Sequence, residues 1–462
     1  MVHSPTMLPN DFIKEADFGL PAHTHHAFLE ALETVAPISL RLNPYKPTVA
    51  NTFQDLPAVA WEAQGRYLPT RPSFTTDVDF WAGSYYVQEA SSMFVGEVLR
   101  QVLPLEEALQ VLDLCAAPGG KSTHLLSLLS AESILVSNEI IRQRAQILGE
   151  NLSRFGQGNF ILTNQNSEKI GQLTGVFDAV VLDAPCSGEG MFRKDREARQ
   201  EWSPANVRIC VARQQGILQN ILPTLKEGGV LIYSTCTFNR QENELNLLPL
   251  LADGWESIKL TVPESWGIIA EETIQNGHIL YSYRFYPHLL QGEGFFVSCL
   301  RKNDSEKYKK PHIKNPHLLP ITAKKQDFLT DWVADLSQYK VYQTAKNDVF
   351  ALPAVQADLM HTLGEALGAW STGYHIGTRK HDDLEPAAAW ALAGKTSINI
   401  PQIALPTHDA LDFLRKNDIA TPVPAQKGWH LATHNGLGLG WLKALPNRWN
   451  NYYPAPWRIR NL

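Results

Sequence analysis

Short apolar runs alternate with helical patterns through the middle of the chain, from about residue 108 to residue 300. This alternation is typical of βαβ units, in which helices cover a mostly parallel sheet. We therefore predict an α/β fold with a Rossmann-like sheet in this part of the chain. The predicted strands are residues 110–115, 134–139, 159–163, 177–183 and 230–236, and residues 279–285 and 294–300 are expected to complete the sheet.

Three stretches between these strands have the pattern of helices, at residues 121–130, 140–154 and about 203–225. The third stretch begins with a clear signal, because Ser203 can cap a helix and Pro204 suits the first helical position. We expect Gly228-Gly229 to end this helix, since glycine is favoured just past a helix C-terminus.

The N-terminal part of the chain has a different pattern. Residues 1–75 combine a helical stretch at 25–34 with a short apolar stretch at 39–43, and a proline-rich tail follows. This mixture predicts a small separate domain.

The C-terminal part begins with a polar stretch. Residues 301–325 contain eight Lys or Arg and two acidic residues, which predicts a linker or an exposed basic strip. Residues 327–336 have a helical pattern, whereas the end of the chain looks rich in β-structure. There, Asn435-Gly436 separates the runs 429–433 and 437–444, which is a strong signal for a β-hairpin.

Length and composition limit the class of protein. A chain of 462 residues corresponds to about three domains, and its 44% hydrophobic residues can fill several cores. No apolar run approaches the roughly 20 residues of a membrane span, so we expect no membrane segment. Five cysteines without paired spacing suit neither a disulfide scaffold nor a zinc site. We expect a cytoplasmic, monomeric protein with reduced thiols and no metal.

The formal net charge of −6 means that the protein as a whole does not attract nucleic acid. Any nucleic-acid binding must therefore come from local patches, and residues 419–462 are one candidate because they contain no acidic residue. Their basic and aromatic residues are Lys427, Lys443, Arg448, Arg458, Arg460, Trp429, Trp441, Trp449, Tyr452, Tyr453 and Trp457. Such a surface suits phosphates and stacked bases, although a tryptophan-rich β core would have the same composition.

Residues 111–122 predict a strand, a turn of small residues and a helix, which lets a ligand approach the backbone closely. A phosphate-binding P-loop would need glycine at position 115, where Cys115 stands. Glu139 ends the next strand twenty residues after Gly119, where Rossmann-like sites hold a ribose diol. The pair indicates a nucleoside cofactor without phosphates, such as S-adenosylmethionine.

Two further strand ends carry a cysteine, Cys186 in a Pro-Cys turn and Cys236 in a Thr-Cys turn. Cys210 and Cys299 have apolar neighbours and are interpreted as core residues. Carbon 5 of a pyrimidine becomes nucleophilic only after a thiolate adds to carbon 6, so these cysteines favour pyrimidine carbon-5 methylation. Asp183 ends the same strand as Cys186 and can stabilise the adduct near ring nitrogen 3.

The segments DLCAAPGGKS (113–122), DAPCSGEGMF (183–192) and STCT (234–237), together with Glu139, resemble the Nol/Nop/Sun RNA cytosine-5-methyltransferases. SLRLNP (39–44) and GSYYVQEASSM (83–93) are similar to that family's N-terminal portion. The resemblance implies a class I methyltransferase domain, with Cys236 as nucleophile and Cys186 aiding release. The S-adenosylmethionine contacts that it implies are Cys115, Ala116, Ala117, Pro118, Gly119, Gly120, Lys121, Glu139, Asp183 and Asn166, where the family usually has Asp.

Residues 373–392 and 435–461 are similar to the bacterial RsmF-like ribosomal RNA subfamily, which implies a C-terminal PUA-like domain. The expected domains are an RNA-binding accessory domain (1–75), the methyltransferase domain (76–305), a linker and middle domain (306–389) and the PUA-like RNA-binding domain (390–462). The implied function is cytosine carbon-5 methylation of small-subunit (16S) ribosomal RNA, as naked RNA or in the subunit. The alternatives are a tRNA methyltransferase, a catalytically idle assembly factor and a P-loop NTPase.

Overall fold

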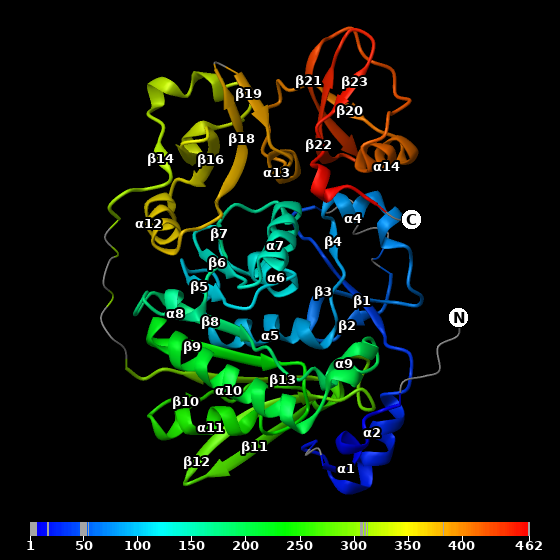
Figure 1. Ribbon diagram of the computed structural model, residues 1–462, viewed down its shortest axis with the longest axis vertical. Helices are drawn as coiled ribbons and strands as arrows, with labels where there is room; N and C mark the ends of the chain where they lie inside the picture. The colour runs from blue at the N-terminus through cyan, green and yellow to red at the C-terminus, as the bar shows by residue number, and fades with distance from the viewer. Residues whose placement is uncertain are drawn as a thin grey trace.

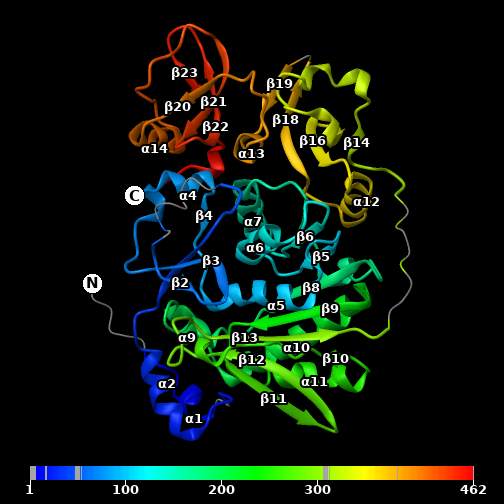
Figure 2. The same ribbon diagram turned by 180° about the vertical axis from the view of Figure 1, so that it is seen from behind.

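The computed structural model describes residues 7–15, 18–46, 53, 55–304, 308, 311, 313–381 and 383–460. Their strands form four sheets, of which the N-terminal sheet lies beside the large central sheet and the two C-terminal sheets lie above both in these views (Figures 1 and 2). None of the helices in these residues is both long and apolar enough to cross a membrane.

The central sheet contains all seven strands predicted for it. They are β5 (Gln110–Asp113), β6 (Ile134–Asn138), β7 (Phe160–Thr163), β8 (Phe177–Asp183), β9 (Leu225–Thr235), β12 (His278–Phe285) and β13 (Phe295–Arg301). The order is β11-β12-β13-β9-β8-β5-β6-β7-β17, in which β5 to β9 run parallel and β13 lies antiparallel to β9. The added strands are β10 (Glu256–Ser257), β11 (Ile269–Gln275) and β17 (Ser371–Thr372).

Helices cover both faces of this sheet, because successive side chains of a strand point to opposite faces. Val111 and Leu135 pack under one layer of helices, and Leu112 and Val136 pack under the other. The first layer contains α5 (Phe94–Val102), α6 (Gly120–Leu128) and α7 (Arg142–Phe155). The second contains α8 (Ser167–Ile170), α10 (Pro204–Ile221), α11 (Glu244–Ala252) and α12 (Ala357–Leu367), and α9 (Arg196–Glu201) lies in the loop after β8.

The predicted end of the third helix is wrong. α10 ends at Ile221, and Pro223, which lacks an N–H, stands in the short 3₁₀ turn that follows. Gly228 and Gly229 lie inside β9 instead, where Gly228 N donates to Lys302 O (2.8 Å) and Gly229 O accepts from Lys302 N (2.9 Å). Gly228 has a φ of 74°, so the pair makes a kink at the start of β9.

The N-terminal part consists of a small sheet and two helices that lie apart from it. β1 (Ile38–Leu42), β2 (Ala58–Val59), β3 (Glu62–Leu68) and β4 (Tyr85–Tyr86) form a sheet in the order β2-β3-β1-β4, with α4 (Val78–Ala82) beside it. α1 (Asn10–Glu15) and α2 (His25–Ala31) lie apart from this sheet in both views. Phe12 and Phe28 pack with Phe192 and Trp202 of the loop after β8, so these helices are joined to the part of the chain that contains the central sheet.

The middle part forms a sheet of β14 (Leu319–Pro320), β15 (Tyr339–Gln343), β16 (Asp348–Pro353), β18 (Tyr374–Lys380) and β19 (Asp383–Pro386). The helix predicted at 327–336 is wrong, since only the 3₁₀ turns Asp327–Leu329 and Leu336–Gln338 occur there. Val333 forms a β-bridge with Thr396, and the Asp335 side chain accepts from Ser337 N (3.0 Å), which competes with a helix.

The predicted basic strip at 301–325 is only partly described. Lys307, Lys309 and Lys310 lie outside the described residues. Lys302 is buried, and its Nζ donates a hydrogen bond to Leu222 O (3.1 Å). This hydrogen bond connects the end of β13 to the turn after α10. It therefore does not belong to an exposed strip.

The C-terminal sheet has the order β20-β21-β22-β23, with β20 (Gln402–Ala404), β21 (Gly428–His434), β22 (Leu437–Ala444) and β23 (Trp449–Asn451), and the helices α13 (Ala388–Ala393) and α14 (Thr407–Arg415) pack on it. The predicted hairpin is confirmed, since Asn435 and Gly436 have φ values of 48° and 78° between β21 and β22. Trp441 and Tyr453 are core residues, whereas Trp429, Trp449 and Trp457 are partly exposed.

Candidate active site

Four neighbouring strands of the central sheet end at one edge. The loops after β5, β6, β8 and β9 carry Cys115, Glu139, Cys186 and Cys236 respectively. A main-chain hydrogen bond from Ala116 N to Asn138 O (2.8 Å) continues the sheet beyond the strands. The strand order changes direction at β5, and open α/β sheets bind ligands at such a point.

The loop between β5 and α6 is built from small residues and held by α7. Gly119 has a φ of 116°, in the region that favours glycine, and α6 begins at the next residue. Arg144 Nη2 donates to Ala117 O (2.8 Å). Asn151 Nδ2 donates to Pro118 O (2.8 Å). These contacts hold the loop backbone in one conformation.

A cavity of about 490 Å³ lies between this loop and the N-terminal sheet. Eight predicted site residues line it: Cys115, Ala116, Ala117, Pro118, Gly120, Lys121, Asp183 and Cys236. Tyr86 and Gln88 supply part of the opposite wall, and two exposed basic side chains, Arg71 and Lys194, also line the cavity. Its volume is typical of a small-molecule site. The cavity thus brings the glycine-containing loop and Cys236 together.

Lys121 and Asp183 form an ion pair inside this cavity. Nζ of Lys121 lies 2.8 Å from Oδ2 of Asp183, and Ser234 Oγ donates to Oδ1 at 3.0 Å. Burial alone would lower the pKa of Lys121, but the Asp183 carboxylate outweighs burial and raises that pKa above its ordinary value. Lys121 therefore carries its charge at neutral pH, and two donors orient Asp183.

A second carboxyl group, Asp113, lies at the end of β5. It is fully buried, and its Oδ2 accepts a hydrogen bond from Ser122 Oγ (2.7 Å). Within the described residues, Oδ1 has no hydrogen-bond partner. Burial raises the pKa of Asp113 to about 7, although the Ser122 hydrogen bond opposes the change.

The two predicted catalytic cysteines are in contact. Sγ of Cys186 lies 3.2 Å from Sγ of Cys236, and both are free thiols. The pKa of Cys186 lies well above its ordinary value, because the hydrogen bond to Cys236, burial and the charge of Glu242 all disfavour its thiolate. Cys210 and Cys299 are buried in α10 and β13, as expected for core residues.

The three remaining predicted cofactor contacts, Gly119, Glu139 and Asn166, are not part of the cavity lining. Gly119 directly precedes α6, beside the cavity. Glu139 is buried, with Oε1 accepting from Ile141 N (2.9 Å) and Oε2 3.4 Å from Nη1 of Arg144. Because Arg144 also binds the loop after β5, Glu139 is connected to that loop. Asn166 caps α8, since its Oδ1 accepts from the first turn's Lys169 N (2.9 Å). Cofactor binding by Glu139 and Asn166 stays a prediction.

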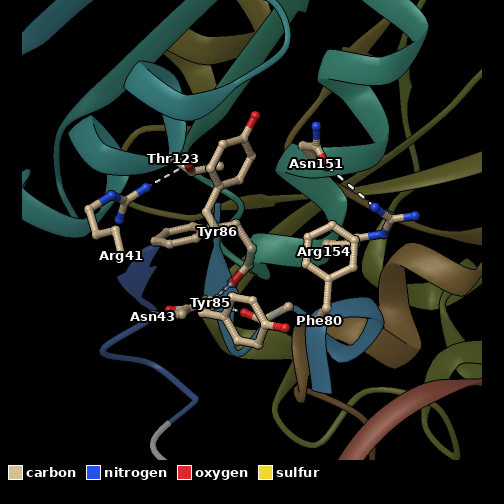
Figure 3. A pocket seen from close by; sticks show the side chains of 10 residues that line it. Arg41, Asn43, Phe80, Tyr85, Tyr86, Thr123, Asn151 and Arg154 are labelled. Atoms are coloured by element: carbon tan, nitrogen blue, oxygen red, sulfur yellow. Dashed lines mark hydrogen bonds between the residues drawn. The ribbon is translucent and has the colours of Figure 1, made fainter. Parts of the chain in front are cut away.

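Arg41 reaches the start of α6 from the N-terminal sheet, a role that the sequence did not predict. Its buried guanidinium donates from Nε to Gln88 Oε1 (2.9 Å) and from Nη2 to Thr123 Oγ1 (2.7 Å). Thr123 Oγ1 donates in turn to Gly119 O (2.8 Å). Figure 3 shows Arg41 directed toward Thr123 beside Tyr86. Burial lowers the pKa of Arg41 to about 10, which leaves it charged.

The cavity drawn in Figure 3 is a domain junction rather than a ligand site. Its volume of about 20 Å³ holds roughly one water molecule. On one side the Arg154 guanidinium lies 4.3 Å from the Trp81 ring centroid, and Lys46 Nζ donates to Ala82 O (2.7 Å) nearby. The junction therefore fixes α7 and the N-terminal sheet to each other.

Two buried carboxylates beside the cysteine pair, Glu189 and Glu242, also have contacts that the sequence did not predict. No group of three or more His, Cys, Asp or Glu side chains suited to a metal ion occurs in the part of the chain that the structure describes.

Three family models match successive parts of the chain. Residues 8–90 match the N-terminal domain of 16S rRNA methyltransferase RsmF, residues 100–301 match 16S rRNA methyltransferase RsmB/F, and residues 401–459 match the methyltransferase RsmF PUA domain. The strand order, the loop after β5 and these matches define an α/β methyltransferase with added N-terminal and PUA domains. The predicted fold class is confirmed.

Relatives match over nearly the full length. The ribosomal RNA small subunit methyltransferase F of Aliivibrio fischeri (strain MJ11) is 30% identical over 481 residues, covering 98% of each chain. The protein of the same name from Aeromonas salmonicida (strain A449) is 28% identical over 474 residues, again covering 98% of each chain. The chain belongs to the ribosomal RNA small subunit methyltransferase F family.

Solved structures share the architecture of about two thirds of the chain. A methyltransferase homolog protein from Pyrococcus horikoshii is 28% identical with a TM-score of 0.53, covering 65% of this chain and 100% of that one. NSun6 from the same organism is 20% identical with a TM-score of 0.54 and the same coverage, and supports the fold alone.

Proposed function

We propose that this methyltransferase transfers the methyl group of S-adenosylmethionine to carbon 5 of a cytosine in 16S ribosomal RNA, through a covalent bond between Cys236 and the base. The observation that carries the proposal is the contact between Cys186 and Cys236 at the edge of a cavity that also holds Asp183 and Lys121. Methylation of a nitrogen or hydroxyl needs no cysteine, whereas carbon 5 needs a nucleophile at carbon 6.

The residues of the cavity fit S-adenosylmethionine. The loop 115–120 has small side chains, so a nucleoside can approach its backbone. We assign Glu139, which directly follows β6, to the ribose hydroxyls, because acidic residues at this position bind the ribose in Rossmann-like sites. When bound, the cofactor supplies an electrophilic methyl group.

The chemistry follows from the side chains around Cys236. Its thiolate would add to carbon 6 of the cytosine, and the electron pair of the carbon 5–carbon 6 double bond would form the new bond from carbon 5 to the methyl group. The bond from the methyl group to the sulfonium sulfur would break at the same time, with the thioether S-adenosylhomocysteine as the leaving group. A base then removes the carbon-5 proton, the double bond re-forms, and the bond from carbon 6 to sulfur breaks, which returns Cys236 as a thiolate. Asp183 stabilises the adduct near ring nitrogen 3, and Cys186 aids release.

Ribosomal RNA is the favoured substrate, because the relatives that match the full length carry the name ribosomal RNA small subunit methyltransferase F. A tRNA substrate is the alternative, since the same cysteine chemistry serves both. Family membership excludes the P-loop NTPase, and the contact between the two cysteines argues against an idle assembly factor.

Bisulfite sequencing tests substrate and position together. We expect one or more cytosines of 16S ribosomal RNA to lose methylation in a strain without the gene, and to regain it with the wild-type gene but not with Cys236→Ala. Loss of a tRNA methylation instead would establish the alternative substrate. Unchanged cytosine methylation in both RNAs would refute the proposal.

A further inference from the structure

Glu242 connects the two loops that carry the cysteines. The loop after β8 carries Cys186, and the loop after β9 carries Cys236 and, six residues later, Glu242. The Glu242 side chain is fully buried, and its Oε2 accepts from Ser187 N (2.9 Å), the residue next to Cys186. The backbone of one cysteine loop is thus bound by a carboxylate of the other.

Two amide side chains complete this contact. Asn239 Nδ2 donates to Oε1 of Glu242 (2.7 Å), and Gln214 Nε2 of α10 donates to Oε2 (3.1 Å). Gln214 also donates to Pro185 O (3.0 Å), on the other side of Cys186. The residues before and after Cys186 are therefore both held by the group around Glu242.

All of these donors are neutral, and no Lys or Arg of the described residues forms a salt bridge with Glu242. Burial raises the pKa of Glu242, whereas the hydrogen bonds from Ser187 and Asn239 oppose this change and stabilise its carboxylate. As a carboxylate close to Cys186, Glu242 disfavours a second negative charge there. Cys236 instead lines the same cavity as the positively charged Lys121 side chain.

We propose that Glu242 is a positioning residue, which holds Cys186 against Cys236 and keeps the proton of this pair on Cys186. The assignment deepens the proposed function, on which it rests. With its proton retained, the Cys186 thiol donates a hydrogen bond to the Cys236 sulfur at 3.2 Å, and this stabilises the thiolate on the residue that attacks carbon 6.

Other charged or titratable groups also face this pair. They are Lys121 from α6, Asp183 from β8, Tyr233 from β9, Glu189 from the loop after β8 and Cys210 from α10. Glu189 is the natural comparison for Glu242. It is equally buried and accepts from Phe238 N (2.8 Å), Asn239 N (3.0 Å) and Trp202 Nε1 (3.0 Å), but it does not bind the residues that flank Cys186.

The test measures the acidity of Cys186 in the full-length protein without RNA or cofactor. Only thiolates react with iodoacetamide, so the rate at each cysteine is followed against pH by peptide mass spectrometry. In Glu242→Gln we expect the profile of Cys186 to move to lower pH by about one pH unit, because a negative charge beside it is removed. In the matched control Glu189→Gln we expect no such movement.

Two outcomes would overturn the assignment. One is an unchanged Cys186 profile in a Glu242→Gln protein whose circular dichroism is that of the wild type. The other is an equal movement in Glu189→Gln, which would make the effect a general result of loop packing. If Glu242→Gln does not fold, Glu242→Asp provides the measurement, since it keeps the charge and should keep the profile of Cys186 at high pH.

A kinetic measurement separates this role from the proposed function. In Glu242→Gln we expect kcat for RNA methylation to fall about tenfold or more, with little change in KM, because the nucleophile is affected and the RNA contacts are not. Restoration by Glu242→Asp supports positioning by the carboxylate. The alkylation experiment uses no RNA. Its result therefore tests the role of Glu242 even if the proposed base or RNA substrate is wrong.

Discussion

Cys186 and Cys236 carry the same functional group but have different roles in the proposed mechanism. We expect Cys236→Ala to form no covalent RNA complex and no 5-methylcytosine. Cys186→Ala should still add to the base and transfer the methyl group, and should then stall before release. A denaturing gel with RNA and S-adenosylmethionine would show a slowly migrating band for Cys186→Ala alone. The reverse pattern would exchange the two roles, and full turnover in both variants would exclude covalent catalysis.

Glu139 provides a test of the cofactor site at a single side chain. Glu139→Ala should weaken S-adenosylmethionine binding by about 1.5–3 kcal/mol, since a charge-assisted hydrogen bond to the ribose is lost. Isothermal titration calorimetry measures the change. Glu132→Ala, at an exposed position before β6, serves as the control. Equal affinities in all three proteins would exclude the ribose contact.

Asp113 makes stability depend on pH. Its pKa is about 7 in the folded protein, whereas an aspartate in an unfolded chain titrates near 3.9. Because the folded state binds the Asp113 proton more tightly, protonation of Asp113 raises the free energy of unfolding. This contribution is fully present below about pH 4 and is lost as the pH rises through about 7. Urea unfolding should therefore show a loss of stability between about pH 4 and about pH 7 that is smaller in Asp113→Asn. The same loss in both proteins would contradict this account.

At the scale of secondary structure, sequence patterns predicted the central sheet well. Its strands are short runs buried on both faces, such as Ile134–Asn138, and the sequence shows such runs directly. The errors came where distant contacts decided the local structure. Gly228-Gly229 forms a kink in β9 rather than a helix end, because the pair forms hydrogen bonds with Lys302. Residues 327–336 do not form the predicted helix, because Val333 pairs with Thr396.

The same limit applies to the candidate site. The loop after β5 and the two cysteine turns are local motifs, so their positions at strand ends could be predicted. The roles of Arg41 and Glu242 could not, because their partners lie 82 positions away at Thr123 and 55 positions away at Ser187. Such contacts depend on strand order and register, which no single segment of the sequence contains.

Arg41 of β1 contacts α6 but does not line the cavity of about 490 Å³, and we expect its substitution to weaken S-adenosylmethionine binding there. Arg41→Met should raise the Kd for S-adenosylmethionine about tenfold, since the buried Thr123 and Gln88 lose a charged partner and the loop after β5 loosens. Fluorescence or calorimetric titration measures the affinity, and circular dichroism checks folding. Arg66→Met, on β3 and with hydrogen bonds only to nearby backbone, is the control. An unchanged Kd in Arg41→Met would show that the loop does not need this brace.

At the scale of the whole molecule, the C-terminal sheet is packed against the N-terminal part. Val78 and Ala82 of α4 share a core with Phe413 and Leu439, and Figures 1 and 2 both show the C-terminal sheet above α4. Removing the PUA domain would therefore expose the core around α4. Point substitutions on its surface are the better test of RNA binding.

We expect Lys427→Glu and Arg448→Glu to weaken RNA binding and to reduce its dependence on salt, because each removes a contact to phosphate. Each should lower the slope of log K against log salt by about one, while S-adenosylmethionine affinity stays unchanged. Lys346→Glu, an exposed lysine of the middle sheet, is the control. Filter-binding at several salt concentrations provides the data. Equal slopes for all four proteins would place RNA binding elsewhere.

The pairing of β17 with β7 has a consequence for aggregation. Ser371 and Thr372 cover the outer edge of β7, and α12 packs beside them on the same sheet. A fragment ending at residue 305 would present β7 as an open edge next to uncovered apolar side chains, and open edges recruit strands from other molecules. Such a fragment should self-associate in size-exclusion chromatography with light scattering. We therefore expect the middle part of the chain to protect the edge of the central sheet from self-association, besides linking this sheet to the PUA domain.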